Sequence, residues 1–432
     1  MASVLVVPPA ASAAGASIGK IKELRITGLK RYTSAEVLPL TGLAAGQSVT
    51  EEDLKDATNQ LAKTGAFSNL AYSYSTLGGA ADVTLDLEET DKLLAVRFDN
   101  FVWWADADLR AKLHARVALY RDQLPMAGSL PDSVADGLQA LLSERQLPGH
   151  VTYSRFAESG QPLEAFVFRV EDISVRIRSV DFPGAAPEMV PALQQSVEKQ
   201  LQGRLYSAGS VAQVSKLEFR NVYESRGYLQ VEFGAPSTTA PDAAKPAPLD
   251  GEPTGDENIV RVDVHIPVKA GPQFRLQSVE WSGNHAIPTS ELEKFAPLQP
   301  GEVADLPQLR QGLEQSAKAY GRHGYMAVKQ KLEMRLDAAA KTAAFTVRIA
   351  EGDVYHFGEL TINGVDSRTA TRLREQWTLR QGEPFDVGYE LTFMRDTQNL
   401  LPQGRWTGAE NHLDEADKTV DVVLKYTPAS IN

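Results

Sequence analysis

Residues 320–325 read Tyr-Gly-Arg-His-Gly-Tyr, and this phrase marks a helical pattern that stops at a glycine just before an alternating strand. Similar phrases occupy 61–67, 223–228 and 400–406, and a weaker copy stands at 149–150. The successive glycines, beginning at Gly65, are 84, 78, 97 and 80 residues apart. A nearly constant period indicates an array of similar modules, each close to the smallest size that supports its own core.

The first copy shows the order of elements within a module. An apolar strand pattern leads to Gly28, and Thr50 precedes three acidic residues, which is typical of a helix start. That helix is expected to end at Gly65. Residues 70–75 and 83–87 then alternate between apolar and polar, which predicts a hairpin whose sheet has one buried face and one wet face.

The same order recurs along the chain, which predicts an α+β fold of five tandem β-α-α-β-β modules. Each module is expected to be a three-stranded mixed sheet with two helices on one face, and the modules to form an extended array. The predicted modules span 20–91, 92–172, 173–270, 271–352 and 353–428. The third contains a stretch at 235–257 that is rich in proline and poor in large apolar residues, and we expect it to be disordered.

The first nineteen residues are expected to lie outside the array. They contain a short apolar stretch and an Ala-Ser-Ala that resembles a cleavage site, but no Lys or Arg precedes that stretch. Residues 1–19 are therefore interpreted either as the remnant of an export signal or as a disordered tail.

Composition excludes several classes of function. The net charge of −12 disfavours nucleic-acid binding, and the lack of cysteine excludes thiolate metal sites and cysteine nucleophiles. No two of the seven histidines have the helical spacing of a metal pair, and no Gly-x-Ser-x-Gly elbow occurs. We therefore predict no enzymatic activity, no cofactor, no metal and no small-molecule substrate.

The second module has an unusual aromatic run at Phe101, Trp103 and Trp104. Such residues pack within a core or against a neighbouring module, or they form a patch that binds a partner. Sequence alone leaves both interpretations open.

The order of elements resembles that of the POTRA (polypeptide-transport-associated) domain. The residues that carry this resemblance are Leu61, Gly65 and Phe67, Tyr320, Gly324 and Tyr325, Val279, Gly283 and Asn284, and Ile349, Glu351 and Gly352. It covers roughly residues 20–428 and is weakest in the second module. Five such domains in tandem look like the periplasmic part of an outer-membrane protein assembly factor of the β-barrel assembly machinery type.

The resemblance implies a place in the periplasm at the inner face of the outer membrane. It also implies binding of unfolded outer-membrane protein precursors and accessory assembly proteins, with a C-terminal membrane barrel in the native full-length chain. A POTRA array of a two-partner-secretion or other outer-membrane translocation system is the alternative.

An open sheet edge pairs with another strand through its main chain, a mode called β-augmentation. A sheet covered on one face is expected to leave two such edges exposed, and the resemblance implies that the strand after each helix-ending glycine lies on one. These strands are predicted at 70–75, 151–155, 229–233 and 326–332. The candidate client-binding residues are Leu70, Tyr72, Tyr74, Val151, Tyr153, Leu229, Val231, Met326, Val328 and Gln330.

Overall fold

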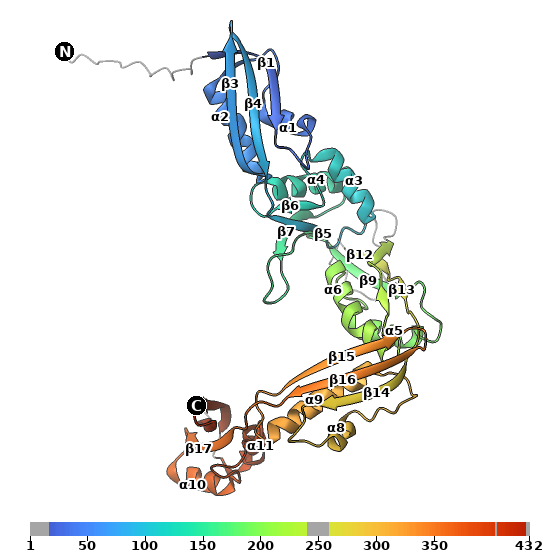
Figure 1. Ribbon diagram of the computed structural model, residues 1–432, viewed down its shortest axis with the longest axis vertical. Helices are drawn as coiled ribbons and strands as arrows, with labels where there is room; N and C mark the ends of the chain where they lie inside the picture. Colours follow the sequence, from blue (N-terminus) through green and yellow to red (C-terminus); the bar gives the residue numbers. More distant parts are fainter. Residues whose placement is uncertain (1–16, 240–258, 402–403, 429–432) are drawn as a thin grey trace, which may run out of the picture. The chain divides into compact units, whose positions relative to one another are not determined.

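The computed structural model describes residues 17–239, 259–401 and 404–428, and it shows an α+β fold (Figure 1). The chain divides into two compact units. The first comprises residues 1–183, 194–214 and 234–267, and the second comprises 184–193, 215–233 and 268–432.

The first unit contains all the described strands of three sheets, together with most of their helices. Its elements are β1 (Ser17–Thr27), α1 (Ser34–Thr41), β2 (Ser48–Thr50), α2 (Glu51–Thr64), β3 (Phe67–Leu77), β4 (Ala80–Glu89), β5 (Leu93–Phe98), α3 (Asp106–Arg116), β6 (Gln123–Pro125), α4 (Leu130–Glu144), β7 (His150–Phe156), β8 (Ala165–Glu171), β9 (Ser174–Asp181), α6 (Ala208–Val214), β11 (Ser237–Thr239) and β12 (Ile259–His265). Helix α5 (Val190–Gln200) has residues in both units.

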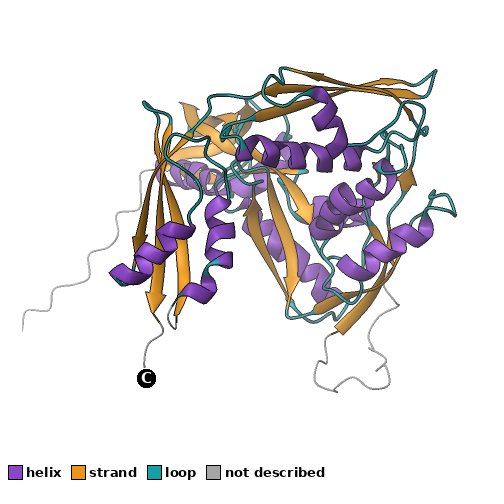
Figure 2. Ribbon diagram, turned by 90° about the horizontal axis from the view of Figure 1, so that it is seen from below, coloured by secondary structure: helices purple, strands orange, loops and turns teal. Residues whose placement is uncertain are grey.

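The second unit contains three further sheets, one of which is the two-stranded sheet β10-β13. Its elements are the π-helical turn η1 (Ser215–Phe219), α7 (Arg220–Glu224), β10 (Glu232–Phe233), β13 (Val268–Lys269), β14 (Arg275–Ser282), α8 (Thr289–Phe295), α9 (Leu306–Arg322), β15 (Lys329–Asp337), β16 (Thr342–Ala350), β17 (His356–Asn363), α10 (Ser367–Gln376), α11 (Tyr389–Asp396), the 3₁₀ turn η2 (Gln398–Leu400), β18 (Gly404–Asp414) and β19 (Thr419–Pro428). Leu373 of α10 and Phe393 of α11 share a core with Val420 of β19, and Figure 2 shows helices over one face of the sheet nearest the C-terminus.

One strand pairing recurs in five of these sheets. The described strand orders are β2-β1-β4-β3, β6-β5-β8-β7, β11-β12-β9, β14-β16-β15 and β17-β19-β18. In each sheet the last strand in the sequence pairs in parallel with the first strand and in antiparallel with the strand just before it. Buried and exposed residues alternate along β4, and its buried Val83 and Leu85 lie on the helix side. The alternation follows the predicted period of two.

Three sequence predictions about the limits of these elements are wrong. The first two sheets have four strands, because the short β2 and β6 pair with β1 and β5. Strand β1 begins at Ser17, within the predicted tail, and β11 (Ser237–Thr239) lies within the predicted disordered insertion. The remainder of both predictions, at 1–16 and 240–257, lies outside the described residues.

Helix α2 begins and ends as its sequence predicts. Thr50 accepts a hydrogen bond from the Asp53 amide at 3.2 Å, while the Asp53 carboxylate accepts one from the Thr50 amide at 2.7 Å. Hydrogen bonds from the Thr50 hydroxyl and amide hold the pKa of Asp53 below its ordinary value. The helix stops at Gly65, which has a φ of 76°.

The loop after β14 shows what Gly283 and Glu351, two of the residues that carry the POTRA resemblance, do in the structure. Gly283 has a φ of 79°, and a Cβ there would lie 2.1 Å from the Ile349 carbonyl oxygen. The Glu351 carboxylate then accepts hydrogen bonds from the amides of His285 and Ala286, at 2.7 and 2.8 Å. The glycine therefore lets the loop approach the last strand, and the glutamate fixes the loop in place.

The second sheet makes this connection with an asparagine. The Asn100 side chain donates to the Val170 carbonyl at 2.9 Å and accepts from the Val170 amide at 2.7 Å. In the neighbouring aromatic run, Phe101 is buried, while Trp103 and Trp104 are half-buried against the same core. All three side chains therefore take part in core packing.

A charged pair ties β9 to β12 in the third sheet. The Arg178 guanidinium donates to Asp263, and the Ser179 hydroxyl adds a further hydrogen bond. The bond from Arg178 outweighs the opposing effect of burial and lowers the pKa of Asp263 to about 2.

We expect Asp263→Asn to lower the free energy of unfolding at pH 7 by about 1–2 kcal/mol. Because the folded-state pKa lies below the unfolded one, the carboxylate stabilises the fold above pH ~4 and loses this effect as the pH falls toward ~2. Chemical denaturation of both proteins at a series of pH values measures the difference. A difference that does not shrink on acidification would contradict the assignment.

Candidate binding edges of the sheets

Five outer strands carry the candidate site, because each lies at the end of its sheet. These strands are β3, β7, β11, β15 and β18, and each pairs with one neighbour in the described part of the chain. The opposite edges are partly covered by β2, by β6, and by isolated bridges at Arg176, Arg275 and His356. The expectation of two exposed edges is therefore wrong, since the chain itself covers part of one.

Strand β3 is long and exposed. It pairs with β4 from Phe67 to Leu77, and its register shift is confined to the Phe67–Asn69 end. Leu70 and Tyr72 pack against the core, whereas Tyr74 and Leu77 have 42% and 87% of their surface exposed. The strand contains no Lys, Arg, His, Asp, Glu or Pro. It therefore has none of the charges or prolines with which edge strands avoid unwanted pairing.

Strand β15 is protected in the way that β3 is not. Its wet face carries five charged residues, which are Lys329, Lys331, Glu333, Arg335 and Asp337. Lys331 and Arg348 lie 3.0 and 3.2 Å from the two carboxylate oxygens of Glu333. The hydrogen bond from Lys331 outweighs burial and keeps the pKa of Glu333 below its ordinary value. A neutral strand would have to displace this charged row to pair with β15.

Strand β7 is shorter and partly occupied by its own helix. The Val151 amide donates to the Gln139 side chain at 2.8 Å, and the Tyr153 hydroxyl donates to Asp132 at 2.6 Å. Burial, together with the hydrogen bond to Asp132, raises the pKa of Tyr153 to about 12. Strand β18 has a register shift between Trp406 and Gly408 and carries charged residues of both signs.

The ten predicted site residues fall into two groups. Six lie in outer strands, which are Leu70, Tyr72 and Tyr74 in β3, Val151 and Tyr153 in β7, and Gln330 in β15. The side-chain amide of Gln330 lies 2.8 Å from the Ser316 hydroxyl of α9, so it faces the helix.

The other four, Leu229, Val231, Met326 and Val328, precede the strands that they were predicted to occupy. Strands β10 and β15 begin only at Glu232 and Lys329, and β10 pairs with β13 instead of β12. Leu229 and Val231 are buried. Alternation alone predicted these strands too early, because a turn follows each glycine before the strand starts.

The sequence analysis did not identify the exposed, uncharged face of β3 as part of the candidate site. Asn69, Ala71, Ser73, Ser75 and Leu77 alternate with the predicted residues and are exposed. The signal was present as an eleven-residue stretch without charge, and a comparison of charge among the outer strands would have found it.

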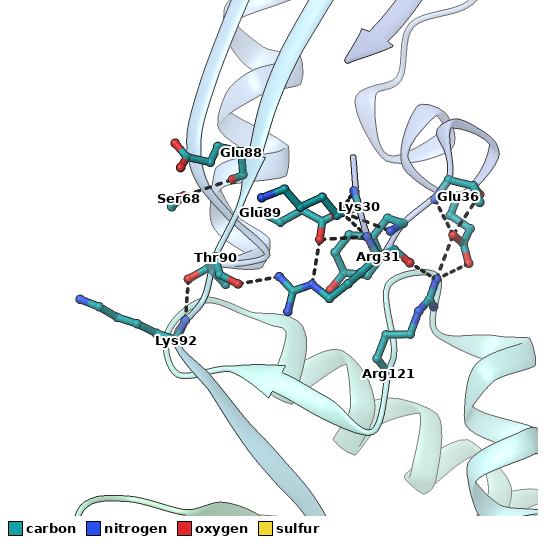
Figure 3. A network of polar contacts seen from close by, with 11 residues as sticks. Lys30, Arg31, Glu36, Ser68, Glu88, Glu89, Thr90, Lys92 and Arg121 are labelled. Carbon is teal, nitrogen blue, oxygen red and sulfur yellow. Dashed lines mark hydrogen bonds and ion pairs between the residues drawn. The ribbon is translucent and has the colours of Figure 1, made fainter. Parts of the chain in front are cut away.

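A buried carboxylate fixes the end of the first sheet. Glu89 accepts hydrogen bonds from the amides of Lys30 and Arg31 at 2.7 and 2.8 Å, and from the Arg31 guanidinium at 2.7 Å (Figure 3). Burial raises the pKa of Glu89, but Arg31 and the backbone amides together outweigh it and leave the pKa below its ordinary value. Next to it, Arg121 contacts Glu36 at 2.9 Å and the Arg31 carbonyl at 3.1 Å (Figure 3).

Within 17–239, 259–401 and 404–428, His, Asp and Glu form no group of three or more that would hold a metal ion. A search of the same residues found no helix with the length and apolar character required to cross a membrane.

Residues 274–352, which include β14 to β16 with α8 and α9, match the POTRA family, described as a surface antigen variable number repeat. A solved structure of the BamA POTRA domains 3–5 from Haemophilus influenzae is 20% identical, with a TM-score of 0.43. That similarity covers 59% of this chain and 96% of the solved one.

Two curated relatives are similar in sequence. The chain is 24% identical over 218 residues to a protein of Treponema pallidum named as an outer membrane protein assembly factor, covering 49% of this chain and 24% of the relative. It is also 24% identical over 140 residues to the outer membrane protein assembly factor BamA of Neisseria meningitidis serogroup B, covering 32% of this chain and 18% of that protein. The chain thus matches a quarter or less of these relatives. Residues 274–352 thus match the POTRA family, and parts of the chain are similar in sequence to two outer membrane protein assembly factors.

Proposed function

We propose that this chain is a periplasmic scaffold of five POTRA-like modules that receives unfolded outer-membrane protein precursors during their assembly and insertion. Precursors bind by β-augmentation, and accessory assembly proteins share the scaffold. The names of the two curated relatives support a role in outer-membrane protein assembly, and neither names a secretion system. The two-partner-secretion alternative therefore has less support.

The open, uncharged edge of β3 is the observation that carries this proposal. Main-chain pairing uses amides and carbonyls that every client possesses, so one edge serves many sequences. Apart from Leu77, the residues on the wet face of β3 are small or polar and leave room for varied side chains, while the exposed part of Tyr74 offers apolar contact on the helix side. An incoming strand that alternates apolar and polar residues satisfies both faces.

A charge graft tests this proposal. The wet face of β15 supplies the five residues Lys, Lys, Glu, Arg and Asp, which would replace Asn69, Ala71, Ser73, Ser75 and Leu77 in the same order. We expect the graft to weaken binding of a fluorescently labelled, alternating peptide about tenfold or more, as measured by anisotropy. All five positions are exposed, so circular dichroism should remain nearly unchanged.

The reverse exchange is the matched control. Placing the five neutral β3 residues on the wet face of β15 should create a second binding edge. Unchanged peptide affinity in the β3 graft would exclude β3 as the binding edge. If the unaltered chain binds no such peptide, the proposed function itself fails.

A further inference from the structure

We propose that the turn after the helix-ending glycine is a plug that completes the core of the next sheet along the chain. The two plugs are residues 227–231 and 324–328, which read Gly-Tyr-Leu-Gln-Val and Gly-Tyr-Met-Ala-Val. Both lie in the second unit. Through them, the β14–β16 sheet depends on residues before it, and the β17–β19 sheet depends on residues of the β14–β16 segment.

The two plugs have the same local structure. The Tyr228 amide donates to the Tyr223 carbonyl at 3.1 Å, and the Tyr325 amide donates to the Tyr320 carbonyl at the same distance. In each pair the ring centroids lie 5.8 Å apart with an edge-to-face arrangement. Because of this turn, the following strand begins several residues after the glycine. The third residue of the plug therefore does not lie on the sheet edge, where the alternating pattern had predicted it.

The third residue of each plug enters the core of the following sheet. Leu229 is 6% exposed and belongs to the cluster of Phe274, Leu276, Leu306, Leu309 and Phe345, which come from β14 and the residue before it, from α9 and from β16. Met326 packs against the cluster of Phe357, Leu373, Phe393, Val420 and Val422, which come from β17 to β19 and its helices. Neither contact lies within the plug's own sheet.

A backbone hydrogen bond holds each plug in place. The Phe274 amide donates to the Gly227 carbonyl at 2.8 Å, and the Tyr355 amide donates to the Gly324 carbonyl at 2.9 Å. Gly324 has a φ of 85°, and a Cβ there would lie 2.5 Å from the Tyr355 carbonyl oxygen. The approach therefore requires glycine, which explains why the phrase recurs in the sequence.

A further contact secures each connection. The Arg310 guanidinium of α9 lies 2.6 Å from the Glu224 carboxylate, whose side chain is 4% exposed. At the second connection, the Val387 amide donates to the Gly321 carbonyl at 3.1 Å. Removing the carboxylate would leave Arg310 without its partner, so the first connection is held by charge as well as by apolar burial.

Hydrogen exchange of the full chain, followed by mass spectrometry, tests this coupling. We expect Met326→Ala to speed exchange in β17 and β19 about tenfold or more and to leave β14 and β16 unchanged. Leu229→Ala should speed exchange in β14 and β16 to a similar or greater extent. If Leu229→Ala does not fold, Leu229→Val should show the same location with a smaller change.

Val328→Ala is the matched control, because Val328 packs against the cluster that contains Leu292 of α8, Tyr320 of α9 and Val347 of β16, which is the core beside its own strand. It should speed exchange in β14 and β16 and spare β17 and β19. The proposal is overturned if Met326→Ala gives this same pattern, or if it changes exchange in neither sheet.

Discussion

Replacing Gly283 by valine is expected to cost about 4 kcal/mol or more and to unfold the β14–β16 sheet. The backbone there has a φ of 79°, which a β-branched residue rarely adopts. The new Cβ would also lie 2.1 Å from the Ile349 carbonyl oxygen, and backbone cannot move aside as a flexible side chain can. Denaturant unfolding and hydrogen exchange in β14 and β16 measure the effect.

Gly301 provides the control for backbone strain alone. Its φ is 89°, yet no atom lies within 4 Å of a Cβ built there. We expect Gly301→Val to cost only about 1–3 kcal/mol, which is the price of the backbone conformation. Equal losses at the two positions would show that the contact with Ile349 contributes nothing.

A second large loss of stability, about 3 kcal/mol, is expected in the first sheet when Glu89 is replaced by alanine. The side chain is 3% exposed, and its loss leaves the amides of Lys30 and Arg31 and the Arg31 guanidinium without their acceptor. Denaturant unfolding monitored by hydrogen exchange in β1 and β4 measures the change. The neighbouring Glu88→Ala alters an exposed residue of the same strand and should cost within about 0.5 kcal/mol.

The effect of Glu89 should also depend on pH. Its folded-state pKa lies below the ordinary value, so its contribution is complete above the unfolded pKa of ~4.3. That contribution is lost as the pH falls through the folded-state pKa. Glu89→Gln should remove this part of the acid sensitivity, and a variant that remains as acid-sensitive as the unaltered chain would contradict this role for the carboxylate.

Sequence reasoning located the elements better than their ends. The capped start of α2 and the positive φ of Gly65 follow from local hydrogen bonds and backbone sterics, which neighbouring residues determine. Strand β15 was predicted from Met326 because its alternation begins there. The structure instead directs Met326 into a different core, and such a long-range contact leaves no periodic signal in the local sequence.

The candidate site was also predicted only in part, because the local sequence pattern locates strands but not their limits. Alternation predicted the strand that contains Leu70, Tyr72 and Tyr74, whereas its place at the edge of the sheet was implied by the resemblance to POTRA domains and agrees with the strand order. The protection of β15 was visible in Lys329 and Lys331, but the contrast with the neutral β3 required the strand limits. The partial cover that β2 and β6 give the opposite edges depends on three-residue strands, too short for a periodic pattern.

The order of pairing makes the formation of each sheet depend on the strand that comes last in the sequence. In all five sheets described above, the strand that leaves the ribosome last lies between its two partners. The earlier strands and helices must therefore wait as an incomplete, aggregation-prone intermediate, and the sheet forms through contacts distant in sequence. A premature stop at the start of β19 would leave β17 and β18 without the strand that pairs with both of them, so the loss of one short segment would prevent a whole sheet from forming.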